Sequence, residues 1–213
     1  MNIIDDAMKA SMPGTAKQFL GSVQPKPMGQ MIMYVAIIAL LPLIGYVLGG
    51  LIGWGGLTWG VIMGVIMYIG TIITVIVTGM IVSMLSAGML GRQISKEEAI
   101  TVIGYAATPA IAIGLIAGLM SGMLFGGLAI LGSIISFLGW LYMAYLLYLG
   151  GGARYGAEKA LPFVGVSVIA WIVISMIFGA IAGAIVWSMM WSAYVNPYAG
   201  YAAKYANYGA YYP

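Results

Sequence analysis

The sequence predicts an all-α integral membrane protein, a bundle of five transmembrane helices with the amino terminus inside and the carboxyl terminus outside. Of its 213 residues, 63% are hydrophobic and 6% are charged, whereas a soluble domain carries about 25% charged residues. Charge-free runs cover residues 27–91, 99–153 and 160–203, and about 20 apolar residues are enough to cross a bilayer. Because these runs are continuously apolar, they favour helices over the alternating strands of a barrel.

Before the first span we place a cytoplasmic segment, residues 1–27. Ala16, Phe19, Leu20 and Val23 recur at helical spacing in it, which favours a short helix on the membrane surface. The alternative is a disordered tail broken by three prolines. The segment has charged residues and prolines in place of a short apolar core, so we expect no cleaved signal peptide and a first span that serves as its own signal.

The membrane domain is placed at residues 28–193, with spans at about 31–49, 57–90, 95–117, 128–149 and 158–191. A glycine-rich hinge with the interfacial residues Trp54 and Trp59 separates the first two spans. The third begins at Ser95-Lys96-Glu97-Glu98, a capping-box sequence. It ends before a turn at residues 118–127. The three glycines at 150–152 suit the carboxyl end of the fourth helix, and the fifth starts near Glu158.

The orientation follows from the basic residues, which gather in cytoplasmic loops. With five spans, seven of the eight fall on one side of the membrane, and only Lys204 falls on the other. The seven are Lys9, Lys17, Lys26, Arg92, Lys96, Arg154 and Lys159. This asymmetry predicts a multi-pass protein of the cell membrane with its amino terminus in the cytoplasm.

The extracytoplasmic tail, residues 194–213, carries tyrosines at alternating spacings of four and three. They are Tyr194, Tyr198, Tyr201, Tyr205, Tyr208 and Tyr212. Such spacing places them on one face of an amphipathic helix, for which Asn196 and Pro197 supply a cap and a first position. The tyrosine face would then bind the membrane surface or another subunit. The alternative is a disordered tail of biased composition.

Small residues at four-residue spacing predict close helix packing at two pairs, Gly60 with Gly64 and Gly179 with Gly183. The pairs fit packing within the bundle or a dimer contact. A row of hydroxyls on the second span, from Thr71 to Ser86, suggests a polar path, although such groups commonly bond backbone or a neighbouring helix.

Several chemistries are excluded by composition. The chain has no cysteine and no histidine, which excludes disulfides, thiolate chemistry and imidazole ligation of a metal or haem. The carboxylates are Asp5, Asp6, Glu97, Glu98 and Glu158. All five lie in the amino-terminal segment or at helix starts, and the spans carry no charge for a proton relay or ion-coupled carrier. We therefore expect no catalytic residue, no cofactor, no metal and no nucleic-acid partner.

One motif suggests a family. Gly104-Tyr105-Ala106-Ala107-Thr108-Pro109 resembles the Gly-Tyr-x-x-x-Pro signature of the Yip family, membrane proteins named for interaction with Rab-type GTPases. The resemblance covers about residues 28–185. The order of the elements in this region is similar to that in prokaryotic Yip-domain proteins. The Asp-Leu-Tyr-Gly-Pro motif of the eukaryotic amino-terminal region is absent, so the resemblance does not extend to GTPase binding or a Golgi role.

Pro109 lacks a backbone donor, so it should leave the carbonyl of Tyr105 without a helical partner and bend the third span. The alternative is a simple kink filled by packing. We expect a non-enzymatic Yip-like membrane protein that organises membrane lipid or holds protein partners, in a homo-oligomer or a larger complex. The alternatives are a passive channel or carrier for a neutral or lipid-like solute, and a structural component that self-assembles through its tyrosine-rich tail.

Overall fold

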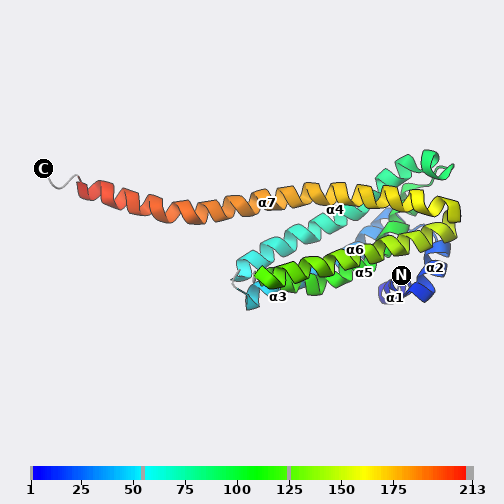
Figure 1. Cartoon of the computed structure of the whole chain (residues 1–213), viewed down its shortest axis with the longest axis horizontal. Helices are drawn as coiled ribbons and strands as arrows, with labels where there is room; N and C mark the ends of the chain where they lie inside the picture. Colours follow the sequence, from blue (N-terminus) through cyan, green and yellow to red (C-terminus); the bar gives the residue numbers. More distant parts are fainter. Residues whose placement is uncertain (1, 54–55, 124–125, 210–213) are drawn as a thin grey trace. The chain divides into compact units, whose positions relative to one another are not determined.

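The computed structural model describes residues 2–53, 56–123 and 126–209. The chain forms two units, Met1–Ser175 (unit 1) and Met176–Pro213 (unit 2). The described residues form seven α-helices and no strand (Figure 1). These are α1 Ile3–Ser11, α2 Pro13–Ser22, α3 Met28–Ile52, α4 Gly56–Leu90, α5 Lys96–Gly122, α6 Gly126–Tyr155 and α7 Ala157–Gly209, which belongs to both units.

Helices α3 to α7 are long and apolar enough to cross a membrane. The candidate spans are Met28–Ile52, Gly56–Leu90, Lys96–Gly122, Gly127–Tyr155 and Ala157–Ile185. The predicted all-α fold with five membrane-spanning helices is confirmed. Gly56, Gly91 and Gly156 sit at the turns between helices with φ of 74°, 70° and 102°, a conformation that glycine adopts without strain.

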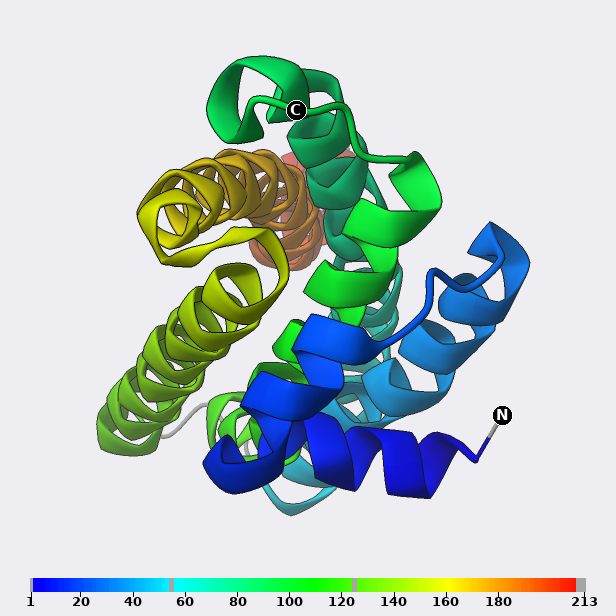
Figure 2. The ribbon, with the colours of Figure 1, turned by 90° about the vertical axis from the view of Figure 1, so that its right-hand side faces the viewer.

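Helix α5 lies at the centre of unit 1. Helices α3, α4 and α6 pack along it, and α1 and α2 also contact it. Of its most apolar stretch, 67% is buried, against 22–33% for the other four spans. Figure 2, an end-on view, shows α1 and α2 lying across one end of the bundle. Helix α5 is therefore the central helix against which α3, α4 and α6 pack.

Glycines allow α3 to approach α5 closely. We predicted a turn after Ala117, but α5 continues to Gly122. A Cβ added at Gly118 would lie 2.9 Å from the carbonyl oxygen of Pro42, and one at Gly122 would lie 2.7 Å from that of Tyr46. These glycines are needed for backbone contact and not for a turn, so the predicted end of the third span is wrong.

The two predicted glycine pairs have different surroundings. A Cβ added at Gly60 of α4 would lie 2.5 Å from the carbonyl oxygen of Tyr46, and one at Gly64 would also contact the α3 backbone. Within unit 2, no described residue lies within 4 Å of a Cβ added at Gly179 or Gly183. The first pair packs inside the bundle, and the second has no packing partner among the described residues of its unit.

The three glycines of α6 do not end that helix. Helix α6 continues through them to Tyr155, and Gly156 provides the positive φ at its end. A Cβ at Gly150 would lie 2.7 Å from the Cβ of Leu20, and one at Gly151 would lie 2.9 Å from the ring of Phe163. The predicted helix end at 150–152 is wrong because these positions admit α2 and α7 to the α6 backbone.

Helix α7 continues without a break from Ala157 to Gly209. A separate tail helix that starts at Asn196 and Pro197 is therefore wrong, because helical backbone already precedes them and no cap is needed. The side chains of Trp191 and of the tyrosines from Tyr194 to Tyr208 lie outside the described residues, as do Trp54 and Tyr212 entirely.

We predict that Gly45→Ala destabilises the bundle, because a Cβ there would clash with the backbone carbonyl of Leu115. Overpacking of this kind costs about 1–3 kcal/mol. Gly88→Ala in α4 is the matched control, since nothing lies within 4 Å of its Cβ position and alanine favours helix by about 1 kcal/mol. Thermal unfolding in mild detergent should show a lower Tm for Gly45→Ala only. Equal Tm values would contradict the close approach of α3 and α5.

Candidate functional site

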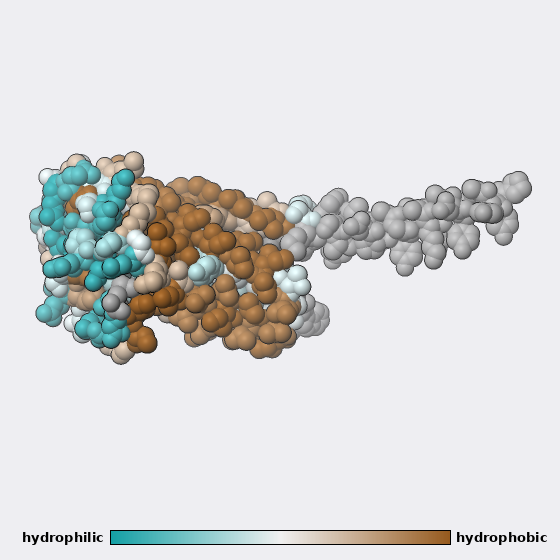
Figure 3. Space-filling view, turned by 180° about the vertical axis from the view of Figure 1, so that it is seen from behind, coloured by the Kyte–Doolittle hydropathy of each residue, from teal (hydrophilic) through white to brown (hydrophobic). Residues whose placement is uncertain are grey.

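Hydrophilic side chains gather at one end of unit 1, and most of the other coloured surface in Figure 3 is apolar. We call this the polar end. It comprises α1, α2, the segment from α2 to α3, the turn between α4 and α5 with the start of α5, and the turn between α6 and α7 with the helix ends that flank it. The polar end holds the seven basic residues that we predicted to share one side of the membrane. The part of the chain with most polar chemistry is therefore also the part that carries the amino terminus.

Residues 3–22 form two short helices, which we call the N-terminal hairpin. In α1, the Asn2 side chain accepts a hydrogen bond from the backbone N–H of Asp5 (3.3 Å) and so caps the helix start. Lys9 donates to Asp5 (2.7 Å), and this hydrogen bond raises the pKa of Lys9. Pro13 occupies the first turn of α2, where it costs no hydrogen bond. The alternative of a disordered tail is wrong for these residues.

The apolar side of α2 faces the bundle and not a membrane surface. Ala16 and Leu20 are fully buried, and Gly150 leaves room for the Leu20 side chain. Gly21 lies beside Ala153 at the end of α6. An open hollow of about 450 Å³ remains next to α2, lined by Gly14, Lys17, Gln18, Gly21, Ser22 and Ala153. The helix was correctly expected, but its apolar face covers α6.

Arg154 fastens the hairpin to the bundle. Its Nη1 donates to the backbone carbonyls of Val23 (2.8 Å) and Leu20 (3.3 Å), at the carboxyl end of α2. These carbonyls have no partner within the helix, and a cation there also complements the helix dipole. Its Nε donates to Glu98 Oε1 at 2.8 Å. Sequence reasoning used Arg154 only as a marker of topology, because nothing in the local sequence links it to residues 20–23.

Glu98 connects the start of α5 to this cluster. The Ser95 side chain accepts from the backbone N–H of Glu98 (3.1 Å), so half of the predicted capping box is present. The Glu98 carboxylate instead accepts from Arg154 and, at 3.3 Å, from Arg92. The Arg92 guanidinium lies 5.2 Å from the Tyr155 ring centre, within the range of a cation–π contact. Glu98 therefore joins two arginines at the polar end.

The signature tyrosine lies beneath α1. Tyr105 is fully buried, and its hydroxyl donates to Asp6 Oδ2 at 3.0 Å. Its ring lies 5.1 Å from that of Phe19 in α2 and 4.7 Å from that of Tyr34 in α3, between centroids. Through Tyr105, the signature connects α5 to three other helices. Asp6 lies 99 residues before Tyr105, so no local pattern identifies it as the partner.

The other signature positions hold α5 against α3. The Cβ position at Gly104 lies 2.8 Å from the Met31 side chain. Thr108 shares a hydrogen bond of 2.7 Å with the Tyr34 hydroxyl and donates to the Gly104 carbonyl at 3.2 Å. Helix α5 runs on through Pro109, so the proline does not end it, and a bend at this point stays a prediction.

The hydroxyls of α4 have identified partners near the polar end. Ser83 donates to the carbonyl of Ile94 (2.8 Å), and Ser86 accepts from the Ile94 N–H (3.0 Å) and donates to the Ser83 carbonyl. Thr71 donates to the Met67 carbonyl at 2.7 Å. These hydroxyls stabilise the backbone of α4 and of the turn that follows it. A polar path along α4 stays a prediction.

The contacts of the polar end position helices. Among the residues that the structure describes, no group of three or more His, Cys, Asp or Glu could hold a metal ion. The carboxylates of Asp6 and Glu98 are engaged by Tyr105, Arg92 and Arg154. The arrangement can fix the N-terminal hairpin on α5 and α6, and it presents the outer side of the hairpin to the surroundings.

We predict that Arg154→Gln loosens the hairpin, because the carbonyls of α2 lose their donor and the largely buried Glu98 loses its closer partner. Breaking a buried pair costs about 3 kcal/mol. Arg92→Gln is the control, because 56% of that side chain is exposed and such pairs contribute under about 1 kcal/mol. Limited trypsin digestion should cleave after Lys17 faster in Arg154→Gln only. Equal cleavage rates in both variants would show that Arg154 does not hold the hairpin.

A family model described as the Yip1 domain matches residues 13–181. The match begins at Pro13, the first residue of α2, and includes α3 to α6 and much of α7. Comparison with curated proteins and with solved structures gives no match. The matched region covers well over half of the 213 residues and includes the signature at Gly104, Tyr105 and Pro109. The chain therefore belongs to the Yip family, as a multi-pass α-helical membrane protein.

Proposed function

We propose that this Yip-family protein is a non-enzymatic membrane protein that holds protein partners, in an oligomer or a larger complex, through its polar end. The observation that carries the proposal is the fastening of the N-terminal hairpin by Arg154 and Tyr105. In this proposal the polar end faces the cytoplasm, in keeping with its seven basic residues. The protein would thereby organise the membrane around its partners.

A fixed hairpin suits partner binding for an entropic reason. A segment that is already ordered loses less conformational freedom when a partner binds than a disordered segment does. Hydrogen bonds hold the hairpin along its length, at Asp6, Ser11, Leu20 and Val23. The bond at Ser11 is donated to its backbone carbonyl by the Tyr142 hydroxyl, at 2.6 Å. The exposed outer side, which includes Lys17 and the adjoining hollow, is then a preformed surface.

The charges of unit 1 also support a role other than ion-coupled transport. Every charged residue of this unit lies in the hairpin, in a turn, or within the first or last turn of a long helix. Proton relays and ion-coupled carriers use ionisable groups inside the membrane. Deeper in the bundle, Tyr34 and Thr108 bond each other.

Cross-linking in native membranes with an amine-reactive reagent tests the proposal. We expect products larger than the monomer that contain this chain and a neighbour. The yield should fall in Arg154→Gln, because the hairpin surface is no longer fixed, and should persist in Arg92→Gln. Mass spectrometry of the complex in mild detergent identifies the neighbour. Finding only monomers, under conditions that cross-link a known oligomer in the same membranes, would overturn the proposal.

A second candidate function is self-assembly through the tail. Helical backbone continues to Gly209, so tyrosines spaced by three and four residues share one face of α7. The tail part of this helix, residues 194–209, is about four turns long, and a stretch of that length is marginal in water unless it packs on a partner. Association through this face would build an array of copies of the chain.

We predict that replacing Tyr201, Tyr205 and Tyr208 by serine weakens such self-association while the spans stay inserted. The matched control replaces Ala199, Ala203 and Ala206 by serine, because these residues lie on the other side of the helix. Analytical ultracentrifugation in detergent should show smaller particles for the tyrosine variant only. Unchanged oligomer size and unchanged protease resistance of the tail would rule out the tyrosine face as the contact.

A further inference from the structure

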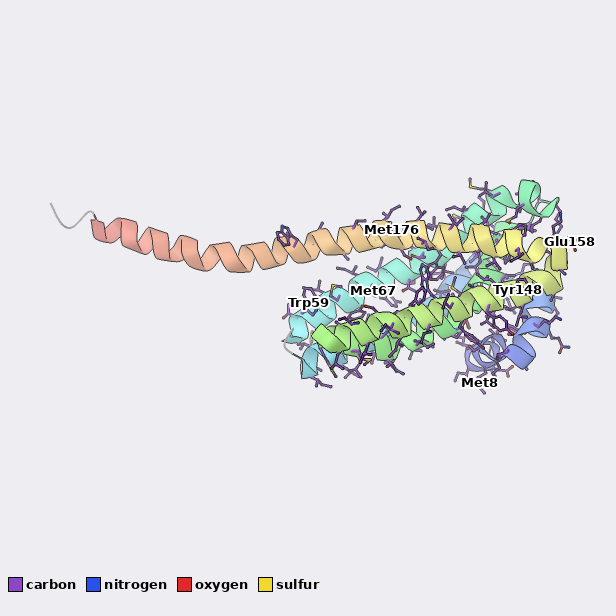
Figure 4. The ribbon with its side chains drawn as sticks, viewed as in Figure 1. Met8, Trp59, Met67, Tyr148, Glu158 and Met176 are labelled. Carbon is purple, nitrogen blue, oxygen red and sulfur yellow. The ribbon has the colours of Figure 1, made fainter. Side chains whose placement is uncertain are left out.

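Helix α1 carries an exposed apolar edge outside the five spans. Ile4, Met8 and Met12 are 73%, 53% and 51% exposed. Four-residue spacing places Ile4 and Met8 along one edge of α1, and Met12 is the residue directly after the helix. Figure 4 shows Met8 on the side of α1 away from α5 and α6. Three large apolar side chains in a row would be unfavourable in water, at about 25 cal/mol for each Å² of apolar surface.

The remaining sides of α1 are already occupied or charged. Ala10 is fully buried, and Ile3 and Ala7 pack against the core. Asp6 accepts the hydrogen bond from Tyr105. On the exposed side, Asp5 and Lys9 form an ion pair of 2.7 Å next to the apolar edge. The exposed surface of α1 is thus divided lengthwise into an apolar edge and a charged edge.

The depth of α1 along the bundle follows from its two polar contacts. Tyr105 lies nine residues after Lys96, the first residue of α5, which is about 14 Å along the helix. Helix α5 has 27 residues and is about 40 Å long, against a hydrocarbon core of about 30 Å. If α5 is centred in the bilayer, Tyr105 lies roughly 8 Å inside the hydrocarbon boundary, and α1 is bonded to it through Asp6.

Exposed tyrosines of α6 mark a similar level independently. Tyr145 and Tyr148 are 46% and 45% exposed, and they lie close along α6 to Tyr142, whose hydroxyl donates to the Ser11 carbonyl at 2.6 Å. Tyrosines with exposed rings gather at the membrane–water interface, where the ring meets acyl chains and the hydroxyl meets headgroups. Helix α1 is therefore held beside an interfacial row of aromatic side chains.

Charge complementarity favours lipid as the occupant of this surface. Among the described residues, Lys17 and Lys26 of the polar end form no ion pair, whereas the hairpin's two carboxylates are engaged by Lys9 and Tyr105. Unpaired lysines near the membrane surface attract anionic headgroups, by about 1 kcal/mol for each cation. An amphipathic helix with this arrangement lies in the interface with its apolar side buried by about 5–10 Å.

We propose that α1 binds the lipid leaflet at the polar end, with Ile4, Met8 and Met12 inserted among the acyl chains and the Asp5–Lys9 edge at the headgroups. The hairpin is then a lipid-contacting collar around α5 and α6, bonded to the family signature through Asp6 and Tyr105. The collar and the proposed partner surface share Lys17, but the inserted apolar side chains belong to α1 and to Met12, whereas the hollow lies beside α2.

Site-directed spin labelling tests this placement on the full chain. The protein has no cysteine, so Met8→Cys, Met12→Cys and Lys9→Cys each carry a single label. The purified variants are placed in vesicles of phosphatidylcholine and phosphatidylglycerol, and the label's collision rates with oxygen and with a water-soluble nickel complex are measured. Oxygen concentrates in the acyl region and nickel in water, so their ratio reports depth.

We expect the oxygen-to-nickel collision ratio to be several-fold higher at positions 8 and 12 than at position 9. Nickel collisions at positions 8 and 12 equal to those at 9 would place the edge in water and overturn the proposal. Low collision rates with both reagents would also overturn it, because they would mean that protein, such as a second copy of the chain, covers the edge. The Lys9→Cys label controls for the folding of α1, and two apolar positions guard against failure of one variant.

Discussion

The bundle depends on close backbone contact between α5 and the helices that surround it. Inside a bilayer the lipid is as apolar as a leucine side chain, so helices associate through van der Waals contact and hydrogen bonds. Glycines such as Gly45 and Gly118 remove the side chains that would keep α3 and α5 apart. All residues from Ala99 to Pro109 are buried as a result. This enclosure fixes where the signature side chains point.

At the polar end, the constraint changes from packing to satisfying polar groups. Helix α2 ends against the bundle, where its last carbonyls would otherwise lack a donor. Arg154 supplies the donor, and Glu98 supplies the counter-charge for Arg154. The glycines of α6 let α2 come near enough for these bonds to form. The hydrogen bonds of Arg154 and the close packing of α2 on α6 thus depend on each other.

The signature gains a physical role from this arrangement. Tyr105 contacts the bundle through its ring and α1 through its hydroxyl. A hydrogen bond to a charged group of this kind contributes about 1.5–3 kcal/mol. A partner or lipid that binds the hairpin therefore binds a segment that is bonded directly to the central helix α5. The partner surface and the lipid-binding surface proposed for the hairpin therefore both depend on the Tyr105–Asp6 hydrogen bond.

The sequence by itself determined the membrane class, the five spans, the family and the grouping of seven basic residues at one end. Those features depend on composition and on local patterns that a bilayer enforces whatever the packing. The roles of Gly118, Gly122 and Gly150–Gly152 were decided by tertiary structure, because glycine suits both a turn and a close helix contact and only the neighbouring backbone distinguishes them. Tyr105 lies 99 residues from Asp6, Glu98 lies 56 residues from Arg154, and Arg154 lies 134 residues from Leu20, so no local pattern identifies these pairs. Asp6 reaches Tyr105 only in the folded chain, because α1 must pack across the end of the bundle onto the buried helix α5.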